Sequence, residues 1–122
     1  MFLNKDGTVK LGDLNVAKVV SNLGYTQTGT PYYASPEIWK DQPYDLKSDI
    51  WSLGCVIYEM AALKMPFNGK DKSVLYKKIL DGKSNLGHYE EIPGIYSKDL
   101  CRIIKRMLMV IPHLRPSCCK IN

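Results

Sequence analysis

Hydrophobic positions along the chain predict one long buried helix near the middle of the sequence. From Ser48 to Leu63 the residues are apolar around nearly the whole helical circumference, which is typical of a helix buried on most sides. Ser48 is a suitable N-cap, and Pro66 is expected to end the helix because proline cannot continue it. We therefore expect this segment to be the central helix of a mainly helical fold.

Two shorter segments also predict helices. The first covers residues 71–80, with Asp71 as its N-cap and Gly82 just beyond its C-terminus. The second covers residues 98–109, with Ser97 as its N-cap. Its apolar residues recur at intervals of three and four: Leu100, Ile103, Ile104, Met107 and Leu108. Its other face is basic: Lys98, Arg102, Lys105 and Arg106. A last short helix is expected after Pro116.

The first residues predict a β-hairpin, and a long loop follows it. Phe2 and Leu3 are expected to form one strand, residues 4–7 a turn that ends in Asp-Gly, and residues 8–12 the return strand. Residues 13–37 have little hydrophobic periodicity and are rich in Ser, Thr, Gly, Tyr and Pro, so we expect one loop. A loop of that length inside a compact domain is usually functional.

Composition excludes few function classes. Hydrophobic residues make up 45% and charged residues 24% of the 122 positions, as in an ordinary globular protein. Lys and Arg number 17 against 12 acidic residues, which gives a net charge of +5. This charge suits an acidic or phosphorylated partner but is too small to indicate nucleic-acid binding. A solvated basic surface is the simpler interpretation.

The four cysteines indicate a reducing compartment. None forms a CxxC pair or a zinc-ligand spacing, and adjacent Cys118 and Cys119 are poor disulfide partners for each other. The first residues include no apolar targeting segment, and the longest apolar stretch is too short and interrupted for a membrane span. We therefore expect a cytoplasmic or nuclear protein.

Four separated motifs then occur in order along the chain. They are Gly-Asp-Leu-Asn at 12–15, Gly-Thr-Pro-Tyr-Tyr-Ala-Ser-Pro-Glu at 29–37, Asp-Ile-Trp-Ser-Leu-Gly at 49–54 and Leu-Arg-Pro at 114–116. Together they resemble motifs of eukaryotic protein kinases, and the match over 29–37 is the most specific. Taken alone, the acid in the first motif would be an ordinary turn residue.

The first motif resembles the kinase Asp-Phe-Gly, in which the aspartate holds magnesium against the phosphates of ATP. The resemblance therefore implies that Asp13 is the metal and cofactor ligand, a role that requires a hard oxygen donor. Leu14 and Asn15 replace the usual Phe and Gly. Leu14 keeps the apolar character of the usual Phe, and Asn tolerates left-handed backbone angles better than most residues. The replacement of Gly by Asn15 therefore affects how easily the motif changes between its inward and outward conformations, and not its metal ligand.

The second motif resembles the segment that receives the peptide substrate in protein kinases. The resemblance implies that the substrate groove consists of five residues: Gly29, Thr30, Pro31, Tyr32 and Tyr33. A threonine at the position of Thr30 is the form found in serine/threonine kinases, where it braces the catalytic loop.

The remaining motifs imply structural supports. In the family, an aspartate at the position of Asp49 holds the backbone of the catalytic loop, although an acid in the first helical turn is also stabilising by itself. Trp51 belongs to the same motif. The resemblance further implies an ion pair between Glu37 and Arg115, which are 78 residues apart and suit a bidentate contact.

Further segments narrow the resemblance. Ser35 stands where most kinases have Ala before Pro-Glu, and fitting residues follow at 75–79, 92–93 and 96–100. Together these resemble NIMA-related (NEK) serine/threonine kinases over essentially the whole chain. The resemblance implies transfer of phosphate from ATP, with Mg2+, to Ser or Thr of protein substrates. It also implies a cytoplasmic location, with the cytoskeleton, the cilium or the nucleus as further places.

Several parts of a kinase domain do not occur in this sequence. It has no Gly-rich phosphate loop, no strand Lys with a helix Glu, and no His-Arg-Asp catalytic loop. We therefore expect a partial kinase fold, with the N-lobe and the catalytic loop absent. It would consist of an activation segment at 13–37 and a helical C-lobe at 38–122, with no catalytic residue of its own and no activity alone.

Regulation and binding remain open alternatives. Thr28, then Thr26 and Ser21, are candidate phosphorylation sites, for which Lys18 is a weak local partner. The alternative function is a non-catalytic protein-binding module that docks partners on the helices at 71–80 and 98–109. A nucleic-acid binder is disfavoured because the sequence lacks a surface on which aromatic residues alternate with arginines.

Overall fold

The structure is a computed structural model that describes residues 2–10, 12, 31–80 and 89–121. Within these ranges the chain is mainly helical, with one two-stranded sheet. The strands are β1 (Phe2–Leu3) and β2 (Val9–Lys10), and the α-helices are α1 (Pro36–Trp39), α2 (Leu46–Ala62), α3 (Lys72–Leu80) and α4 (Lys98–Met107). Three short 3-10 helices complete the set: η1 (Pro31–Tyr33), η2 (Pro112–Leu114) and η3 (Cys118–Lys120).

The predicted hairpin is confirmed. Strands β1 and β2 are antiparallel, and Leu3 lies opposite Val9. Gly7 ends the turn with φ +83°, a backbone angle that a residue with a side chain rarely adopts. The turn is further fixed because the Thr8 amide donates to the carboxylate of Asp6 over 2.9 Å.

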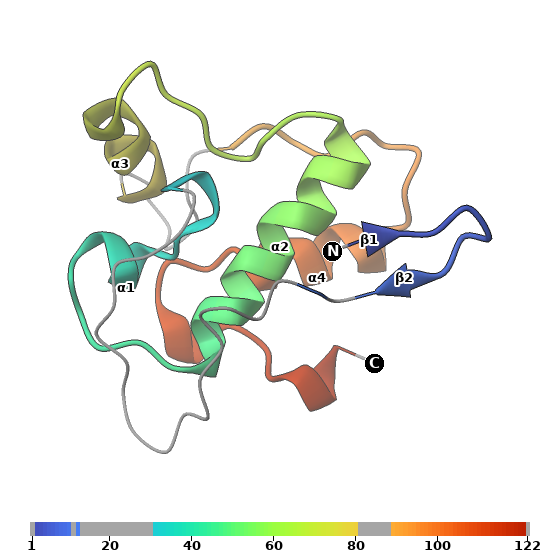
Figure 1. The fold of residues 1–122 in the computed structure, drawn as a ribbon. Helices are drawn as coiled ribbons and strands as arrows, with labels where there is room; N and C mark the ends of the chain where they lie inside the picture. Colours follow the sequence, from blue (N-terminus) through green and yellow to red (C-terminus); the bar gives the residue numbers. More distant parts are fainter. Residues whose placement is uncertain (1, 11, 13–30, 81–88, 122) are drawn as a thin grey trace.

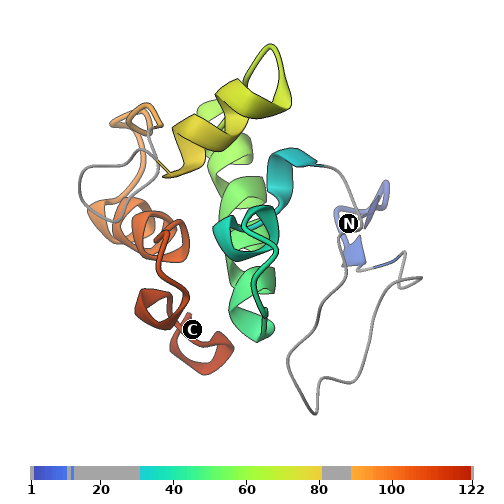
Figure 2. The same ribbon diagram turned by 90° about the vertical axis from the view of Figure 1, so that its left-hand side faces the viewer.

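Helix α2 runs through the middle of the molecule, as expected (Figure 1). Figure 2 shows α4 on one side of it and the hairpin on the other. Its buried residues include Trp51, Cys55 and Tyr58, but Met60 is 57% exposed. The prediction of a helix buried on most sides is therefore wrong for its outer face.

The predicted start of α2 is wrong, whereas its C-terminal end at Ala62 lies one residue from the predicted end. The N-cap is Asp45, whose side chain accepts from the Lys47 amide over 2.8 Å, and not Ser48, which lies in the first turn. At the other end the helix stops before Pro66, because Leu63 adopts a left-handed conformation with φ 55°. The Leu63 amide still donates to the Glu59 carbonyl.

The caps predicted for the other helices are present. Asp71 accepts from the Val74 amide before α3, and Ser97 accepts from the Leu100 amide before α4. Helix α4 ends at Met107, two residues before the predicted end, and the segment after Pro116 is a 3-10 turn. The predicted Gly82 stop lies outside the described residues.

Helices α2 and α4 are in close contact because Gly54 has no side chain. A Cβ atom at this position would lie 2.8 Å from the Cβ of Met107. The contact places the buried Ile104 and Leu108 in one core cluster with residues of α2.

The loop predicted over 13–37 is wrong at its C-terminal end, because η1 and the start of α1 lie within it. All four cysteines are free thiols. Cys55 is buried, whereas Cys118 and Cys119 are exposed. Among the described residues, no helix has both the length and the apolar character that a membrane crossing needs.

Candidate functional site

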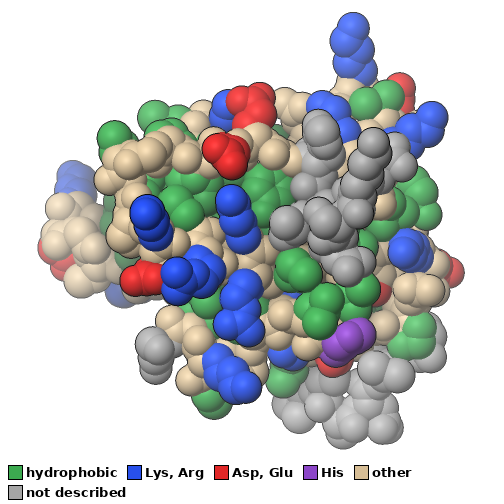
Figure 3. All heavy atoms as spheres, turned by 180° about the vertical axis from the view of Figure 1, so that it is seen from behind, with side chains coloured by type: hydrophobic (Ala, Val, Ile, Leu, Met, Phe, Trp, Pro, Cys, Tyr) green, Lys and Arg blue, Asp and Glu red, His purple; other side chains and the backbone are tan. Residues whose placement is uncertain are grey.

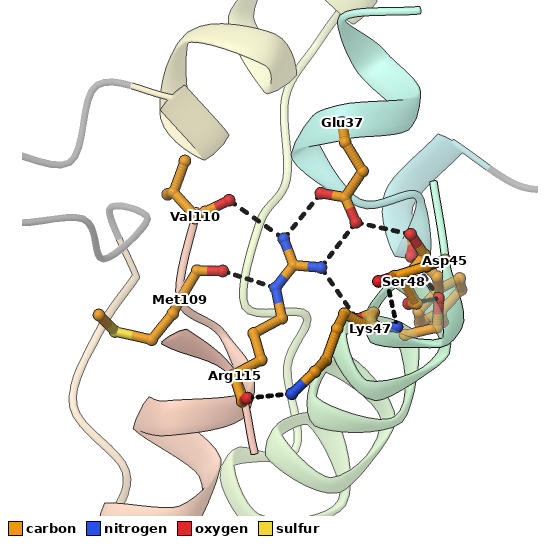
Figure 4. A network of polar contacts seen from close by, with 9 residues as sticks. Glu37, Asp45, Lys47, Ser48, Met109, Val110 and Arg115 are labelled. Atoms are coloured by element: carbon orange, nitrogen blue, oxygen red, sulfur yellow. Dashed lines mark hydrogen bonds and ion pairs between the residues drawn. The ribbon is translucent and has the colours of Figure 1, made fainter. Parts of the chain in front are cut away.

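A buried ion pair joins two segments that are far apart in the sequence. The Nη1 and Nη2 atoms of Arg115 each lie 2.7 Å from one carboxylate oxygen of Glu37, so the contact is bidentate (Figure 4). Glu37 is 4% exposed and Arg115 is 2% exposed. The contact that the motifs implied between these residues is therefore present.

Three backbone carbonyls take the remaining N–H groups of Arg115. Its Nε donates to the Met109 carbonyl over 2.7 Å, Nη1 to Lys47 over 2.9 Å and Nη2 to Val110 over 3.1 Å. A guanidinium has five N–H donors, and all five are used here. This arrangement ties α1, the start of α2 and the segment after α4 to one side chain.

Two further contacts complete the network in Figure 4. The Ser48 hydroxyl donates to the Glu37 carboxylate over 2.6 Å, and the Lys47 ammonium donates to the Arg115 carbonyl over 2.5 Å. Burial alone would raise the pKa of Glu37. The hydrogen bonds from Arg115 and Ser48, together with the charge of Arg115, outweigh it and leave the pKa below its ordinary value.

Two stacked aromatic rings, Trp51 and Phe67, lie next to the guanidinium of the ion pair. The Arg115 guanidinium lies 5.1 Å from the ring centre of Trp51, a favourable cation–π position. Trp51 in turn stacks on Phe67, with ring centres 5.3 Å apart. Trp51 is fully buried, so the ring excludes water from this side of the ion pair.

The chain just before α1 is attached to α2 by two hydrogen bonds. The Tyr33 hydroxyl donates to the Glu59 carboxylate over 2.9 Å, and the Ser52 hydroxyl donates to the Tyr33 carbonyl over 2.9 Å. The bond to Glu59, with burial, raises the pKa of Tyr33, so this phenol remains a donor. Residues 33–37 are thus held at both ends, by Tyr33 and by Glu37.

Several predicted site residues lie outside the described residues, so the structure does not place them. They are Asp13, Gly29, Thr30, Ser21, Thr26 and Thr28, together with Leu14, Asn15 and Lys18. Of the described ones, Tyr32 and Tyr33 are half-buried and Asp49 is exposed in the first turn of α2. The described part of the chain contains no group of three or more His, Cys, Asp or Glu side chains that would suit a metal ion.

Sequence reasoning missed the other members of this site. Ser48 was interpreted as a cap and not as a partner of Glu37, and neither Lys47 nor Glu59 was singled out. The spacing of apolar residues carries no signal for these contacts, because each joins segments that meet only in the folded chain.

The comparisons with known proteins agree with the motifs. The family described as "Protein kinase domain" matches residues 1–122. This chain belongs to the protein kinase family. The resemblance to NIMA-related serine/threonine kinases is confirmed by the relatives of this kinase chain, which are 40–47% identical to it over nearly its whole length.

Three relatives illustrate the similarity. The chain is 44% identical to the mouse serine/threonine-protein kinase Nek4, over 96% of the chain and 14% of that protein. It is 46% identical to the G2-specific protein kinase nim-1 of Neurospora crassa, over 95% of the chain and 13% of that protein. It is 47% identical to the probable serine/threonine-protein kinase nek3 of Dictyostelium discoideum, over 95% of the chain and 10% of that protein. The kinase chain thus spans a small part of the length of these relatives.

Proposed function

We propose that the protein containing this chain transfers the γ-phosphate of ATP to Ser or Thr residues of protein substrates. The chain would supply the C-terminal lobe of its kinase domain, with an activation segment at 13–37 and a helical part at 38–122. The observation that carries this proposal is the buried pair of Glu37 and Arg115. It fixes the end of the proposed substrate segment to the helical part, and family membership gives the pair its functional context.

The proposed cofactors are ATP and Mg2+, with Asp13 as the metal ligand. The magnesium, when bound, neutralises charge on the transferred phosphate, and a carboxylate is the donor type that it prefers. The assignment of Asp13 rests on its motif and on family membership.

The proposed substrate groove comprises residues 29–33, with Thr30 as a brace. Phosphoryl transfer depends largely on holding the substrate in position, which requires a rigid surface. The hydrogen bonds of Tyr33 to Glu59 and Ser52 support this role, because they restrict the segment that would contact the peptide.

The proposed structural supports are Glu37, Asp49, Trp51 and Arg115. Asp49 is exposed, so its carboxylate is accessible to backbone donors of another segment. Thr28, then Thr26 and Ser21, are the proposed phosphorylation sites, and the cytoplasm is the proposed compartment.

The isolated chain is proposed to be inactive, because its sequence contains neither a catalytic loop nor a nucleotide-binding lobe. A second candidate function is a non-catalytic module that binds proteins through α3 and α4. The exposed basic residues of α4 favour this alternative.

Phosphate transfer by the full-length protein tests the first proposal. With Mg2+, ATP and a Ser/Thr peptide, the wild-type protein should phosphorylate the peptide and the Asp13→Asn variant should not. Asp6→Asn, a change of the same kind in the hairpin turn, should leave the rate unchanged. Activity that survives Asp13→Asn would contradict the role of Asp13, and an inactive wild-type protein would favour the binding module.

Phosphopeptide mapping tests the proposed modification sites. The active full-length protein should carry phosphate on Thr28 or Thr26. A map in which both residues are unmodified would refute this part of the proposal.

A further inference from the structure

The outer face of α4 is a compact basic surface. At 100° per residue, Lys98, Arg102, Lys105 and Arg106 fall within an arc of roughly 100° and over about 12 Å of helix. All four are exposed, and the opposite face, which contains Ile104 and Met107, is buried. Figure 3 looks at the side of the molecule on which α4 lies and shows Lys and Arg side chains gathered near its middle.

Little within the described residues neutralises this surface. Asp99 forms an ion pair with Arg102 over 2.9 Å, but the Arg102 side chain remains 71% exposed. No ion pair joins Lys98, Lys105 or Arg106 to any acidic residue in the described ranges. The face therefore presents several solvated cations to an incoming anion.

We propose that this face of α4 binds an extended acidic segment of a partner protein. Lys98, Arg102 and Arg106 follow one another at intervals of four residues, a rise of about 6 Å each along the helix. Alternate residues of an extended chain are about 6.6 Å apart and project to the same side. Carboxylates at every second position of the partner can thus pair with successive turns of α4.

Other anionic partners fit this face less well. A helix that binds a membrane surface inserts its apolar face, but the apolar face of α4 packs inside the protein. Binding of single-stranded nucleic acid uses aromatic side chains for base stacking, and no exposed residue of α4 is aromatic. The proposal does not rest on phosphoryl transfer, because docking here needs no catalysis.

Fluorescence anisotropy on the full-length protein tests the proposal with a labelled peptide of about ten residues that has Glu at alternate positions. Wild-type protein should bind it, and more weakly as salt is added. The variant Lys98→Ala/Lys105→Ala should bind about 2- to 30-fold more weakly, the sum expected for two exposed charges. The matched control Lys5→Ala/Lys40→Ala, which removes two exposed charges elsewhere, should change binding less than about 2-fold.

A second peptide, with the same composition but with its Glu residues contiguous, tests whether the spacing of the carboxylates matters. This comparison needs only the wild-type protein. It should bind more weakly, because only every second side chain faces α4. Equal loss in both double variants, equal binding of both peptides, or no binding would overturn the proposal. Tighter binding to phosphatidylserine vesicles or to a single-stranded oligonucleotide would also overturn it. If the alanine variant fails to fold, Lys98→Gln/Lys105→Gln replaces it.

Discussion

Arg115 makes more contacts than any single substitution can preserve. Its five N–H groups donate to the carboxylate of Glu37 and to three backbone carbonyls, and its guanidinium carbon lies over the Trp51 ring. A lysine has a point charge and no planar donor array, so it cannot reproduce this geometry. The residue acts as a junction of three segments, and not merely as a charge.

Removing this guanidinium should be costly. Arg115→Met leaves the Glu37 carboxylate buried without its partner, so the free energy of unfolding should fall by about 3–5 kcal/mol. Urea unfolding, followed by tryptophan fluorescence, measures this change. Arg102→Met is the control, because this exposed arginine should cost no more than about 0.5 kcal/mol. Similar losses in the two variants would contradict a special role for the buried pair.

The lowered pKa of Glu37 predicts that the protein loses stability at acidic pH. This part of the curve of stability against pH is its acid limb. A carboxyl whose pKa is lower in the folded state stabilises the fold above its unfolded pKa, about 4.3, and loses this contribution as pH falls through the folded value. The unfolding midpoint, measured at pH values from neutral to strongly acidic, should therefore decrease once the pH is lower than the unfolded pKa. The fall should be smaller in Glu37→Gln. In Glu91→Gln, which alters an exposed carboxyl outside the buried network, the acid limb should stay close to that of the wild type. An unchanged acid limb in Glu37→Gln would disprove this assignment.

At the scale of elements, the contact between α2 and α4 depends on Gly54. In an isolated helix Gly54→Ala would be stabilising by about 1 kcal/mol, but here the added methyl meets Met107 and Leu108. Such overpacking should cost about 1–3 kcal/mol in a thermal or urea unfolding measurement. Gly94→Ala is the control, because nothing lies within 4 Å of its added Cβ. A stabilising effect of Gly54→Ala would show that the helices adjust their spacing freely.

The sequence predicted the type of each main element better than its ends. The apolar run of α2, the capping residues of α3 and the spaced apolar residues of α4 identified these helices, because each of these signals is a local property of the sequence. The start of α2 was misplaced because Asp45 and Ser48 are both good caps, and only the tertiary position of Glu37 decides how Ser48 is used. Local sequence contains no information on that choice.

The candidate site was predictable where a motif extends over it. Glu37 and Arg115 were found because each belongs to a recognisable segment, although they are 78 residues apart. Tyr33 was assigned to the substrate groove, but its partner Glu59 was not, because a half-buried glutamate in an apolar helix has no distinctive neighbours in the sequence. Contacts between segments depend on packing and not on spacing.

At the scale of the molecule, the outer side of α2 exposes apolar side chains. Leu46, Leu53 and Met60 recur every seven residues and so lie along one side of the helix, and Leu46 and Met60 are more than half exposed. Leu63, just beyond the helix end, is 89% exposed. Exposed apolar side chains of this kind favour association when nothing covers them.

The isolated 122-residue chain should therefore self-associate. Sedimentation velocity over a range of concentrations should show species larger than the monomer, and Met60→Lys should reduce them. Gln42→Lys adds the same charge at an exposed position without removing apolar surface, so it should have a smaller effect. A chain that is monomeric at every concentration would contradict this expectation.

The unequal exposure of the thiols allows opening of the core to be measured by chemical labelling. Burial raises the pKa of Cys55 to about 12, so this sulfur stays protonated and unreactive while the core is closed. A maleimide should modify the exposed Cys118 and Cys119 first, the half-buried Cys101 later, and Cys55 only when α2 separates from its neighbours. The delay between the fast and slow labelling steps then measures how often the centre of the protein opens.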